Sequence, residues 1–481
     1  TAQDPGCVPV NLLATGPALT PEVLEFIEIP FGTQSSELRQ TVGHAHVTGD
    51  LIDLWAGPLA TVWGIEYRRE ESDFITSAIQ QQGLGFFNST RRATTGAFDV
   101  AEFFAEGQLP LLRDAPFAKS LNFEGAVRFA DYSTAGTETS WKFGGDWTPV
   151  DDIRFRVIRA KAVRAPNISE LFSPGSEGFI TVDDPCDVAF VDGGSANRAS
   201  NCAALGVPQN FVSNARTINI RTDSGGNPNL DVEEADTWTV GGVITPRWLP
   251  GLSVTADWWR IELSGAVDTL DAQDILDQCV DSGDINNQFC TSITRAASGD
   301  LLQIRRNNLN LDTLIREGID LEGRYSASIG EGTLDFTGNT TRLLTSERDT
   351  TSSGGSVIDD LGEVGDPKWR ANLNLVYRVG GWTINVNERF LSTQQIENQP
   401  ATLEDNRALA KTGNEWFTDL SIRYQITPQL SATFGIDNVF DNLPPNLPET
   451  RTAGAGSGSA DGATLFDSRG RFVRWGFNLT L

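Results

Sequence analysis

The chain has 481 residues, 64 of them acidic and 37 basic, and its net charge of −27 argues against a nucleic-acid binder, which needs a basic surface. With 26 Phe and 12 Trp it is too aromatic for a disordered protein, and no run of about 18 apolar residues predicts a transmembrane helix. It begins at Thr1, contains no methionine and shows no signal peptide. We therefore expect the front of the protein to be absent.

Alternating apolar and polar residues are the dominant pattern, and they predict β-strands with two different faces. In the segment 369–379, for example, Leu373 and Leu375 alternate with Asn372 and Asn374. About fifteen such segments follow one another in chain order, near 38–54, 59–73, 97–107, 119–132, 138–148, 152–163, 235–246, 251–262, 304–326, 332–345, 369–379, 381–391, 415–426, 429–440 and 470–481. Helical periodicity is nearly absent, so the chain is predicted to be all-β.

The connections between these segments are of two kinds. Short turns rich in Gly and Pro alternate with long polar loops near 74–95, 165–234, 264–300, 346–367, 393–413 and 442–469. Short turns at one end and long loops at the other are typical of an antiparallel up-and-down transmembrane β-barrel, with short periplasmic turns and long extracellular loops.

Aromatic residues near strand ends favour the membrane interpretation over a packed soluble sheet, although alternation alone fits both. Trp369, Trp382, Trp416 and Tyr424 lie on the apolar face close to turns, as interfacial residues do. The last strand ends at Leu481, where outer-membrane barrels usually end in Phe.

The five cysteines lie in loops or near the N-terminus. Cys186 and Cys202 share one long loop, and Cys279 and Cys290 share another, which favours two disulfides in an oxidising compartment over a zinc site. Cys7 is left over, either as a free thiol or as one half of a pair whose partner lies upstream. A short helix packed on its own disulfide is expected within 268–280.

Motifs of catalysis are missing, since the chain has no Gly-x-Ser-x-Gly elbow and no P-loop. We expect no enzyme and no cofactor. His44 and His46 share one face of a strand and are interpreted as polar residues of the lumen, with metal binding as the alternative. Three carboxylates, Asp183, Asp184 and Asp187, are either solvated or bind Ca²⁺.

Two motifs give the chain a resemblance to TonB-dependent outer-membrane receptors. The segment 164–174, at the top of a strand, and the segment 435–444, in the penultimate strand, resemble barrel motifs of that family. The residues that carry this likeness, which we expect to be structural, are Arg164, Pro166, Asn167, Leu171, Phe172, Asn438 and Phe440.

The resemblance implies a barrel of about 22 strands with a plug domain, of which this chain would be the C-terminal part. Residues 1–37 would be a loop segment leading into the barrel, residues 38–481 would be barrel, and the plug and the TonB-contacting segment would be missing. The last fifteen strands alone would expose an edge at each end of the sheet.

The resemblance also implies an outer-membrane receptor of a bacterium that takes up a scarce nutrient, such as a siderophore–iron complex, cobalamin or a saccharide. Its partners would be the TonB complex, outer-membrane lipid and lipopolysaccharide, and the substrate, with no nucleic acid. Candidate substrate contacts are the loop aromatics Phe179, Phe190 and Phe211 and the inward-facing Trp259. The alternatives are a passive porin-like channel and a secreted glycan-binding β-protein.

Overall fold

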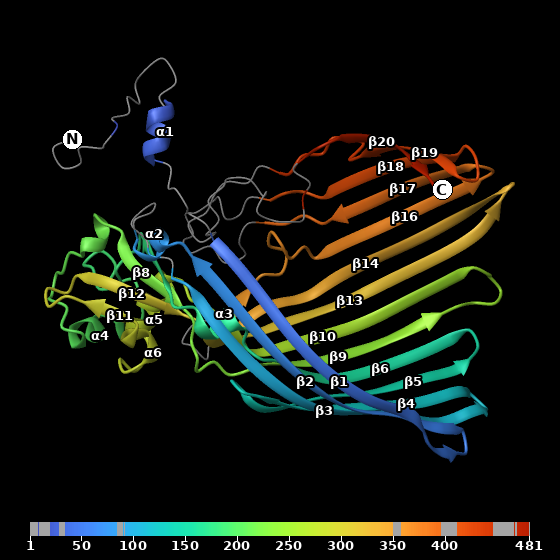
Figure 1. The fold of residues 1–481 in the computed structure, drawn as a ribbon, viewed down its shortest axis with the longest axis horizontal. Coiled ribbons are helices and arrows are strands. Elements are labelled where there is room, and N and C mark those ends of the chain that lie inside the picture. Colours follow the sequence, from blue (N-terminus) through green and yellow to red (C-terminus); the bar gives the residue numbers. More distant parts are fainter. Residues whose placement is uncertain are drawn as a thin grey trace.

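One large antiparallel sheet dominates the computed structural model, which describes residues 8, 20–27, 34–83, 90, 92–349, 357–395, 411–445, 466 and 469–480 (Figure 1). The sheet has 16 strands, and since β15 pairs only with β14, its path runs through fifteen in chain order. These are β1 (Gln34–Leu54), β2 (Gly57–Thr76), β3 (Thr94–Ala115), β4 (Ala118–Tyr132), β5 (Gly136–Val150), β6 (Ile153–Arg164), β9 (Glu233–Ile244), β10 (Leu252–Asp268), β13 (Leu309–Ile329), β14 (Gly332–Asp349), β16 (Trp369–Val379), β17 (Trp382–Leu391), β18 (Glu415–Gln425), β19 (Leu430–Asp437) and β20 (Phe472–Leu479), while β15 is Val357–Asp359.

The predicted all-β meander is confirmed, and each strand of the path overlaps one predicted segment. One prediction was wrong in its extent, because the segment 304–326 is not a single strand. It divides at Asn308 into β12 (Leu301–Asn307), which belongs to a separate small sheet, and β13. Both pieces are extended and follow each other almost directly, so the alternation hides the break.

The sheet is curved and open along one side (Figure 1). Among the strands that the structure describes, β1 pairs only with β2 and β20 pairs only with β19. The register puts side chains of one parity on a common face across many strands.

Tight turns close one end of the sheet. Gly330 and Gly380 have φ values of 60° and 53°, a left-handed conformation that glycine adopts at little cost, and they join β13 to β14 and β16 to β17. The long connections leave from the other end, as predicted, except that β4 and β5 are joined there by a short turn.

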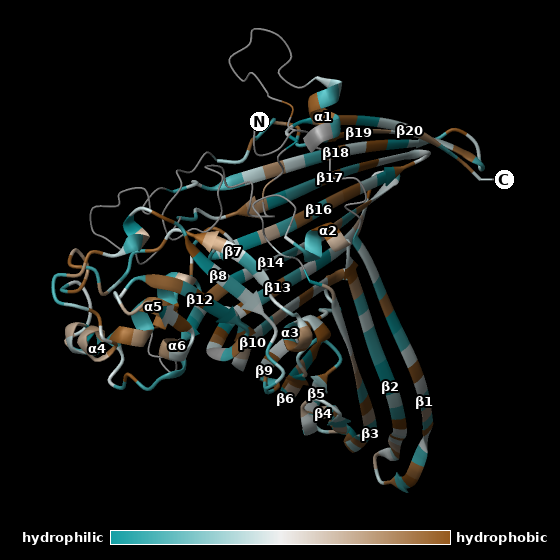
Figure 2. Cartoon of the chain, turned by 60° about the vertical axis from the view of Figure 1, so that its left-hand side comes forward, coloured by the Kyte–Doolittle hydropathy of each residue, from teal (hydrophilic) through white to brown (hydrophobic). Residues whose placement is uncertain are grey.

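The two faces of the sheet differ in polarity, and bands of opposite hydropathy alternate along β1 and β2 in Figure 2. On the polar face Arg156 binds Asp257 across the sheet, with a shortest distance of 2.5 Å. On the other face the rings of Trp382 and Tyr424 lie 4.4 Å apart near the tight turns. Trp416 contacts Phe390 at the same distance near the opposite end.

Contrary to the prediction of plain polar loops, the two longest connections fold together. Residues 176–225 and 270–307, which we call the loop unit, form a four-stranded sheet in the order β11-β12-β8-β7, and β8 pairs in parallel with β12. Its elements are β7 (Ser176–Ile180), α4 (Arg198–Ala204), the 3-10 helix Asn214–Arg216, β8 (Ile220–Gly225), α5 (Ala272–Asp281), α6 (Gln288–Thr291), β11 (Ile293–Arg295) and β12. The helix expected within 268–280 is α5.

The loop unit has its own hydrophobic core, which includes Ile220, Leu276 and Ile304 with at most 1% of their surface exposed. Three further short helices are α1 (Pro21–Ile27), α2 (Ala78–Gln81) and α3 (Ile168–Phe172). Of the helices that the structure describes, none has the length and apolar character needed to cross a membrane.

Candidate functional site

Both expected disulfides are present and lie in the loop unit. Cys186 is bonded to Cys202 and Cys279 to Cys290, with Cα–Cα distances of 5.6 Å and 4.7 Å. Each bond closes a stretch within one of the two long connections, so neither joins one connection to the other. Cys7, the fifth cysteine, lies outside the described residues.

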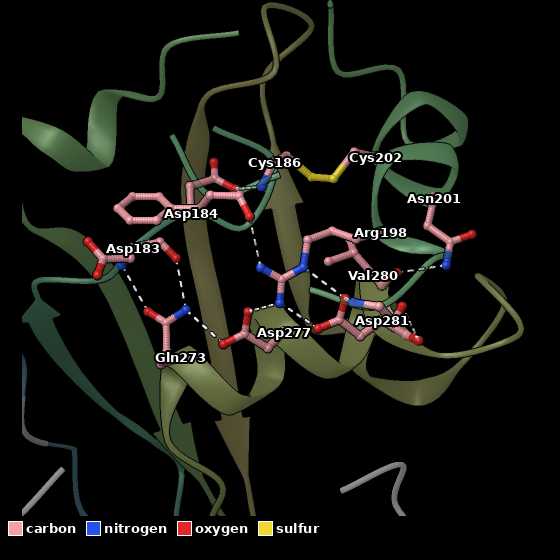
Figure 3. Close-up of polar contacts among 12 residues, drawn as sticks. Asp183, Asp184, Cys186, Arg198, Asn201, Cys202, Gln273, Asp277, Val280 and Asp281 are labelled. Atoms are coloured by element: carbon pink, nitrogen blue, oxygen red, sulfur yellow. Dashed lines mark hydrogen bonds and ion pairs between the residues drawn. A yellow bond between two sulfur atoms is a disulfide. The ribbon is translucent and has the colours of Figure 1, made fainter. Parts of the chain in front are cut away.

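Ion pairs join the two connections (Figure 3). Arg198 of α4, whose side chain is 9% exposed, donates to Asp281 from Nε and to Asp277 from Nη2, each at 2.8 Å. The side chain of Gln273 of α5 makes two hydrogen bonds to the backbone of Asp183: Nε2 donates to the carbonyl oxygen and Oε1 accepts from the N–H, each at 2.8 Å. The unit is therefore held together by charge pairs across its seam as well as by its core.

Two of the three carboxylates considered for Ca²⁺ are buried and neutralised by arginines. Asp184 accepts two hydrogen bonds from Arg295 at 2.7 and 2.8 Å, and both side chains are under 10% exposed. Asp187 pairs with Arg216. In the described part of the chain, no three His, Cys, Asp or Glu side chains converge on a possible metal position. The carboxylates therefore stabilise the unit, and the Ca²⁺ alternative is not supported.

The electrostatics of these carboxylates follow from burial and from their partners. Burial alone would raise the pKa of Asp187, but the hydrogen bond from Arg216 and those from the backbone N–H groups of Ala189 and Ser213 outweigh it and lower the pKa to about 2. Burial raises the pKa of Asp277 above its usual range. These groups are tied to arginines of the loop unit and stabilise its structure.

The face of the small sheet that points away from the core borders a cleft of about 200 Å³. Charged side chains line it, and further lining comes from residues 173–176. The charged lining residues are Arg92, Glu177, Arg221, Asp223 and Arg305. The cleft lies between the loop unit and the connection that contains Arg92, and therefore at the end of the sheet from which the long connections leave.

A second cleft, of about 500 Å³, lies on the polar face of the large sheet over β2 to β6. Arg128 donates to Glu102 at 2.9 Å there and lies 5.1 Å from the centre of the Phe104 ring. Acidic and basic side chains alternate along this wall, so it offers polar contacts without a single sign of charge.

The candidate contact residues have very different exposures. Phe179 of β7 is 53% exposed and lies opposite Arg221 of β8 in the register, so both side chains are on the face that borders the smaller cleft. Phe211 is only 8% exposed and packs in the core of the loop unit, which favours a packing role. Phe190 is half-buried, and its carbonyl accepts a hydrogen bond from Arg198.

Trp259 lies on the polar face of β10, with Asp257 two residues away on the same face. Its ring fits against Gly318 of β13, where a Cβ atom would lie 2.6 Å from Cζ2. Its buried Nε1 has no hydrogen-bond partner among the described residues. The structure therefore separates Trp259 from the three loop aromatics and places it in the wall of the sheet.

The motif residues near 164–172 form a compact structural exit from β6. Asn167 caps α3, because its Oδ1 accepts from Glu170 N at 2.9 Å while a Glu170 carboxylate oxygen accepts from Asn167 N at 2.7 Å. Arg164 binds the same carboxylate at 3.0 and 3.1 Å. The remaining residues of the motif pack nearby: Pro166 and Leu171 are buried, and Phe172 contacts β3 at Gly96.

Asn438 supports the exit from β19 in a similar way. Its φ is 52°, it is 2% exposed, and its amide exchanges hydrogen bonds with the backbone of Asn442 at 2.7 and 2.9 Å. Phe440 is 67% exposed. His44 and His46 lie on the polar face of β1 with ring centres 5.9 Å apart, and Leu481 lies outside the described residues.

The arginines of the smaller cleft were not singled out in the sequence. Arg221 and Arg305 lie 84 positions apart, since 305 − 221 = 84, and only the parallel pairing of β8 with β12 brings them together. No local motif could have indicated this, because both strands were hidden in segments that looked like polar loops or like the start of β13.

Comparison with known proteins places the fold. A family model described as "TonB dependent receptor-like, beta-barrel" matches residues 17–439. No curated protein matches the chain. Among solved structures, the ferric enterobactin receptor PfeA from Pseudomonas aeruginosa matches with a TM-score of 0.62 and 15% identity, over 92% of this chain and 54% of that one.

Two other structures match similarly. The siderophore receptor PirA from Acinetobacter baumannii has a TM-score of 0.59 at 14% identity, over 93% of this chain and 55% of its own. The FrpB iron transporter from Neisseria meningitidis has a TM-score of 0.53 at 12% identity, over 92% and 55%. The chain thus spans little more than half the length of the solved structures that it matches, and at these identities the likeness shows the fold.

Proposed function

The chain belongs to the TonB-dependent receptor β-barrel family, and on this premise we propose that the protein is an outer-membrane receptor that takes up a scarce nutrient with energy supplied through TonB. The observation that carries the proposal is the family match over residues 17–439, on a fifteen-strand amphipathic meander. The relatives in solved structures are described as receptors for ferric enterobactin or another siderophore and as an iron transporter. Iron chelates are therefore first among the proposed substrates, before cobalamin and saccharides.

The two faces of the sheet support this function by their chemistry. Aromatic pairs such as Trp382–Tyr424 and Phe390–Trp416 suit the boundary between lipid and water at the two ends of the strands. The opposite face, with pairs such as Arg156–Asp257, suits a wet passage for a polar solute. The protein would contact outer-membrane lipid and lipopolysaccharide with one face and the solute with the other.

The loop unit gives the proposed receptor a rigid element for capture outside the cell. Its two disulfides fit an oxidising location, and its core keeps the exposed face of its sheet in a fixed shape. A preorganised surface binds ligand with less loss of conformational entropy than a flexible loop does.

A deletion strain tests the proposal. Cells without the gene are grown with iron chelates, cobalamin or oligosaccharides as the limiting nutrient, and we expect a growth defect on one nutrient that the intact gene restores. A matched variant replaces residues 176–225 and 270–307 by Gly/Ser linkers; it should reach the outer membrane and fail to restore growth. Recovery of the protein as a freely soluble monomer, with no part in the outer-membrane fraction, would contradict the proposal.

A further inference from the structure

The smaller cleft of the loop unit has a local charge opposite to that of the whole chain. The chain carries −27, whereas the cleft is lined by three arginines and two carboxylates, which leaves 3 − 2 = 1 positive charge. We call it the arginine cleft, lined by Arg92, Arg221, Arg305, Glu177 and Asp223. In a protein with a negative net charge, this local positive charge attracts anions to the cleft.

Both carboxylates of the arginine cleft already have partners. Arg221 donates from one nitrogen to Glu177 at 2.6 Å and to Asp223 at 3.5 Å. Asp223 also accepts from Gln303 of the neighbouring strand. Arg221, Glu177 and Asp223 therefore bind one another, and among the described residues no acidic side chain pairs with Arg92 or Arg305.

Arg305 and Arg92 keep unused hydrogen-bond donors. Arg305 donates from Nη2 to the Thr291 carbonyl at 3.1 Å, and no described residue forms an ion pair with it. Arg92 has no side-chain partner among the residues that the structure describes. A guanidinium carries five N–H donors in a planar fork that fits the oxygens of a carboxylate or phosphate. Both groups line the same cleft, so their free donors are available to one anion.

Strand geometry fixes the orientation of Arg305. Ile304, its neighbour in β12, has 0% of its surface exposed and belongs to the core, so the alternation of the strand turns Arg305 to the opposite, open face. Phe179 is on that face too, opposite Arg221 in the register and 53% exposed. The cationic lining thus has an exposed aromatic ring beside it.

We propose that the arginine cleft binds the compact anionic group of a soluble ligand, a carboxylate or a phosphate, and that Phe179 contacts an adjacent planar part of the same ligand. The inference rests on the proposed function, because a receptor that captures its substrate with extracellular loops meets the ligand here. It narrows the substrate to molecules with such an anionic group.

Binding of phenyl phosphate to the full chain in detergent micelles tests the proposal. Its dianion supplies the proposed anionic group and its ring the proposed planar part, and ligand-observed NMR gives its dissociation constant. We expect Arg305→Gln and Arg92→Gln each to weaken binding about tenfold, the effect of losing one charge-assisted hydrogen-bonded contact. Binding should also weaken as the salt concentration rises.

The matched control is Arg306→Gln, one residue along β12. Arg306 donates to the Leu270 carbonyl at 2.9 Å and to Asp271 at 2.7 Å, and does not line the cleft. The Arg306→Gln variant should bind phenyl phosphate as tightly as the unchanged chain does. Phenol, which lacks the anionic group, should bind to the unchanged chain far more weakly. Retention of both disulfides in every variant, checked by mass, shows that the unit still folds.

The inference would be overturned if the unchanged chain, Arg305→Gln and Arg92→Gln bound phenyl phosphate with equal affinity. It would also be overturned if phenol bound as tightly as phenyl phosphate. Binding only to vesicles that contain lipopolysaccharide, with none to phenyl phosphate, would also overturn it, since the ligand would then be a lipid headgroup. The purified chain needs no TonB for this measurement. If the deletion strain shows the expected growth defect but phenyl phosphate does not bind, the inference alone is rejected. If phenyl phosphate binds through both arginines but the deletion strain grows normally on every nutrient tested, the proposed function alone is rejected.

Discussion

Asp187 shows how single residues hold the loop unit in shape. Its carboxylate has no exposed surface, pairs with Arg216 and accepts backbone hydrogen bonds from Ala189 at 2.7 Å and Ser213 at 2.8 Å. Hydrogen bonds to an ionised acceptor are stronger than neutral ones. A buried charge is tolerated here because every oxygen has a donor.

The ionisation of Asp187 makes the stability of the loop unit depend on pH. Its pKa falls from about 3.8 to about 2 on folding, so its stabilisation is fully present above about pH 4 and is lost as the pH falls towards 2. Native-state hydrogen exchange of the α5 amides, corrected for intrinsic rates, should show opening in this window.

Asp187→Asn should remove most of that dependence and cost roughly 1–3 kcal/mol at neutral pH, since Arg216 is 40% exposed and can return to water. The exposed Asp192 supplies the control, and Asp192→Asn should leave the exchange unchanged. An unaltered pH profile in Asp187→Asn would show that another group carries the effect.

The exposure of an aromatic side chain can be predicted from the sequence in a strand but not in a loop. Phe179 and Phe211 looked alike as loop aromatics, yet the first is 53% and the second 8% exposed. Their exposure depends on contacts between distant parts of the chain, such as that of the Phe211 ring with Gly299. By contrast, the apolar-face positions of Trp382 and Trp416 followed from strand parity alone, and both are exposed.

At the scale of elements, α3 depends on one glycine of β3. A Cβ atom on Gly96 would lie 2.5 Å from Phe172 Cδ2 and 2.7 Å from Ile168 Cγ2, so only glycine lets the helix pack so closely. Gly96→Val should cost about 1–3 kcal/mol through overpacking and expose residues 165–176 to protease. Gly43→Val, where nothing lies within 4 Å of the added Cβ, is the control. Equal protection of α3 in both variants would contradict this packing.

The disulfides test whether the loop unit is stabilised separately from the sheet. Cys186→Ser with Cys202→Ser opens a link over 16 residues, and we expect a loss of about 3 kcal/mol in the unit. The large sheet should keep its heat-modifiable mobility in gels, because no disulfide of the described residues joins it to the unit. A simultaneous loss of the sheet would contradict the separation.

The elements also divide by how far the sequence predicts them. Fifteen strands follow from a local period of two, which is written into each segment. The loop unit depends on β8 pairing with β12 and on Arg198 reaching Asp277 and Asp281. Contacts between residues so far apart produce no periodic pattern in the sequence. The small sheet and its cleft are therefore visible only in the structure.

At the scale of the whole molecule, a curved amphipathic sheet carries a cystine-linked unit at the end opposite its tight turns. The open edges at β1 and β20 are unpaired among the described strands, and sheet edges of this kind invite further strand pairing. The proposed function uses this division, with capture by the unit and passage of the ligand along the polar face of the sheet.

Uptake driven through TonB, the proposed function, is measured by the accumulation of the nutrient found in the deletion screen. Uptake of that nutrient in radiolabelled form is followed in intact cells, in cells lacking the gene and in cells with TonB disrupted. We expect that loss of the gene and loss of TonB each abolish accumulation, while binding of the nutrient to the cell surface survives the loss of TonB. Accumulation that continues without TonB would identify a passive channel and rule out TonB-driven uptake.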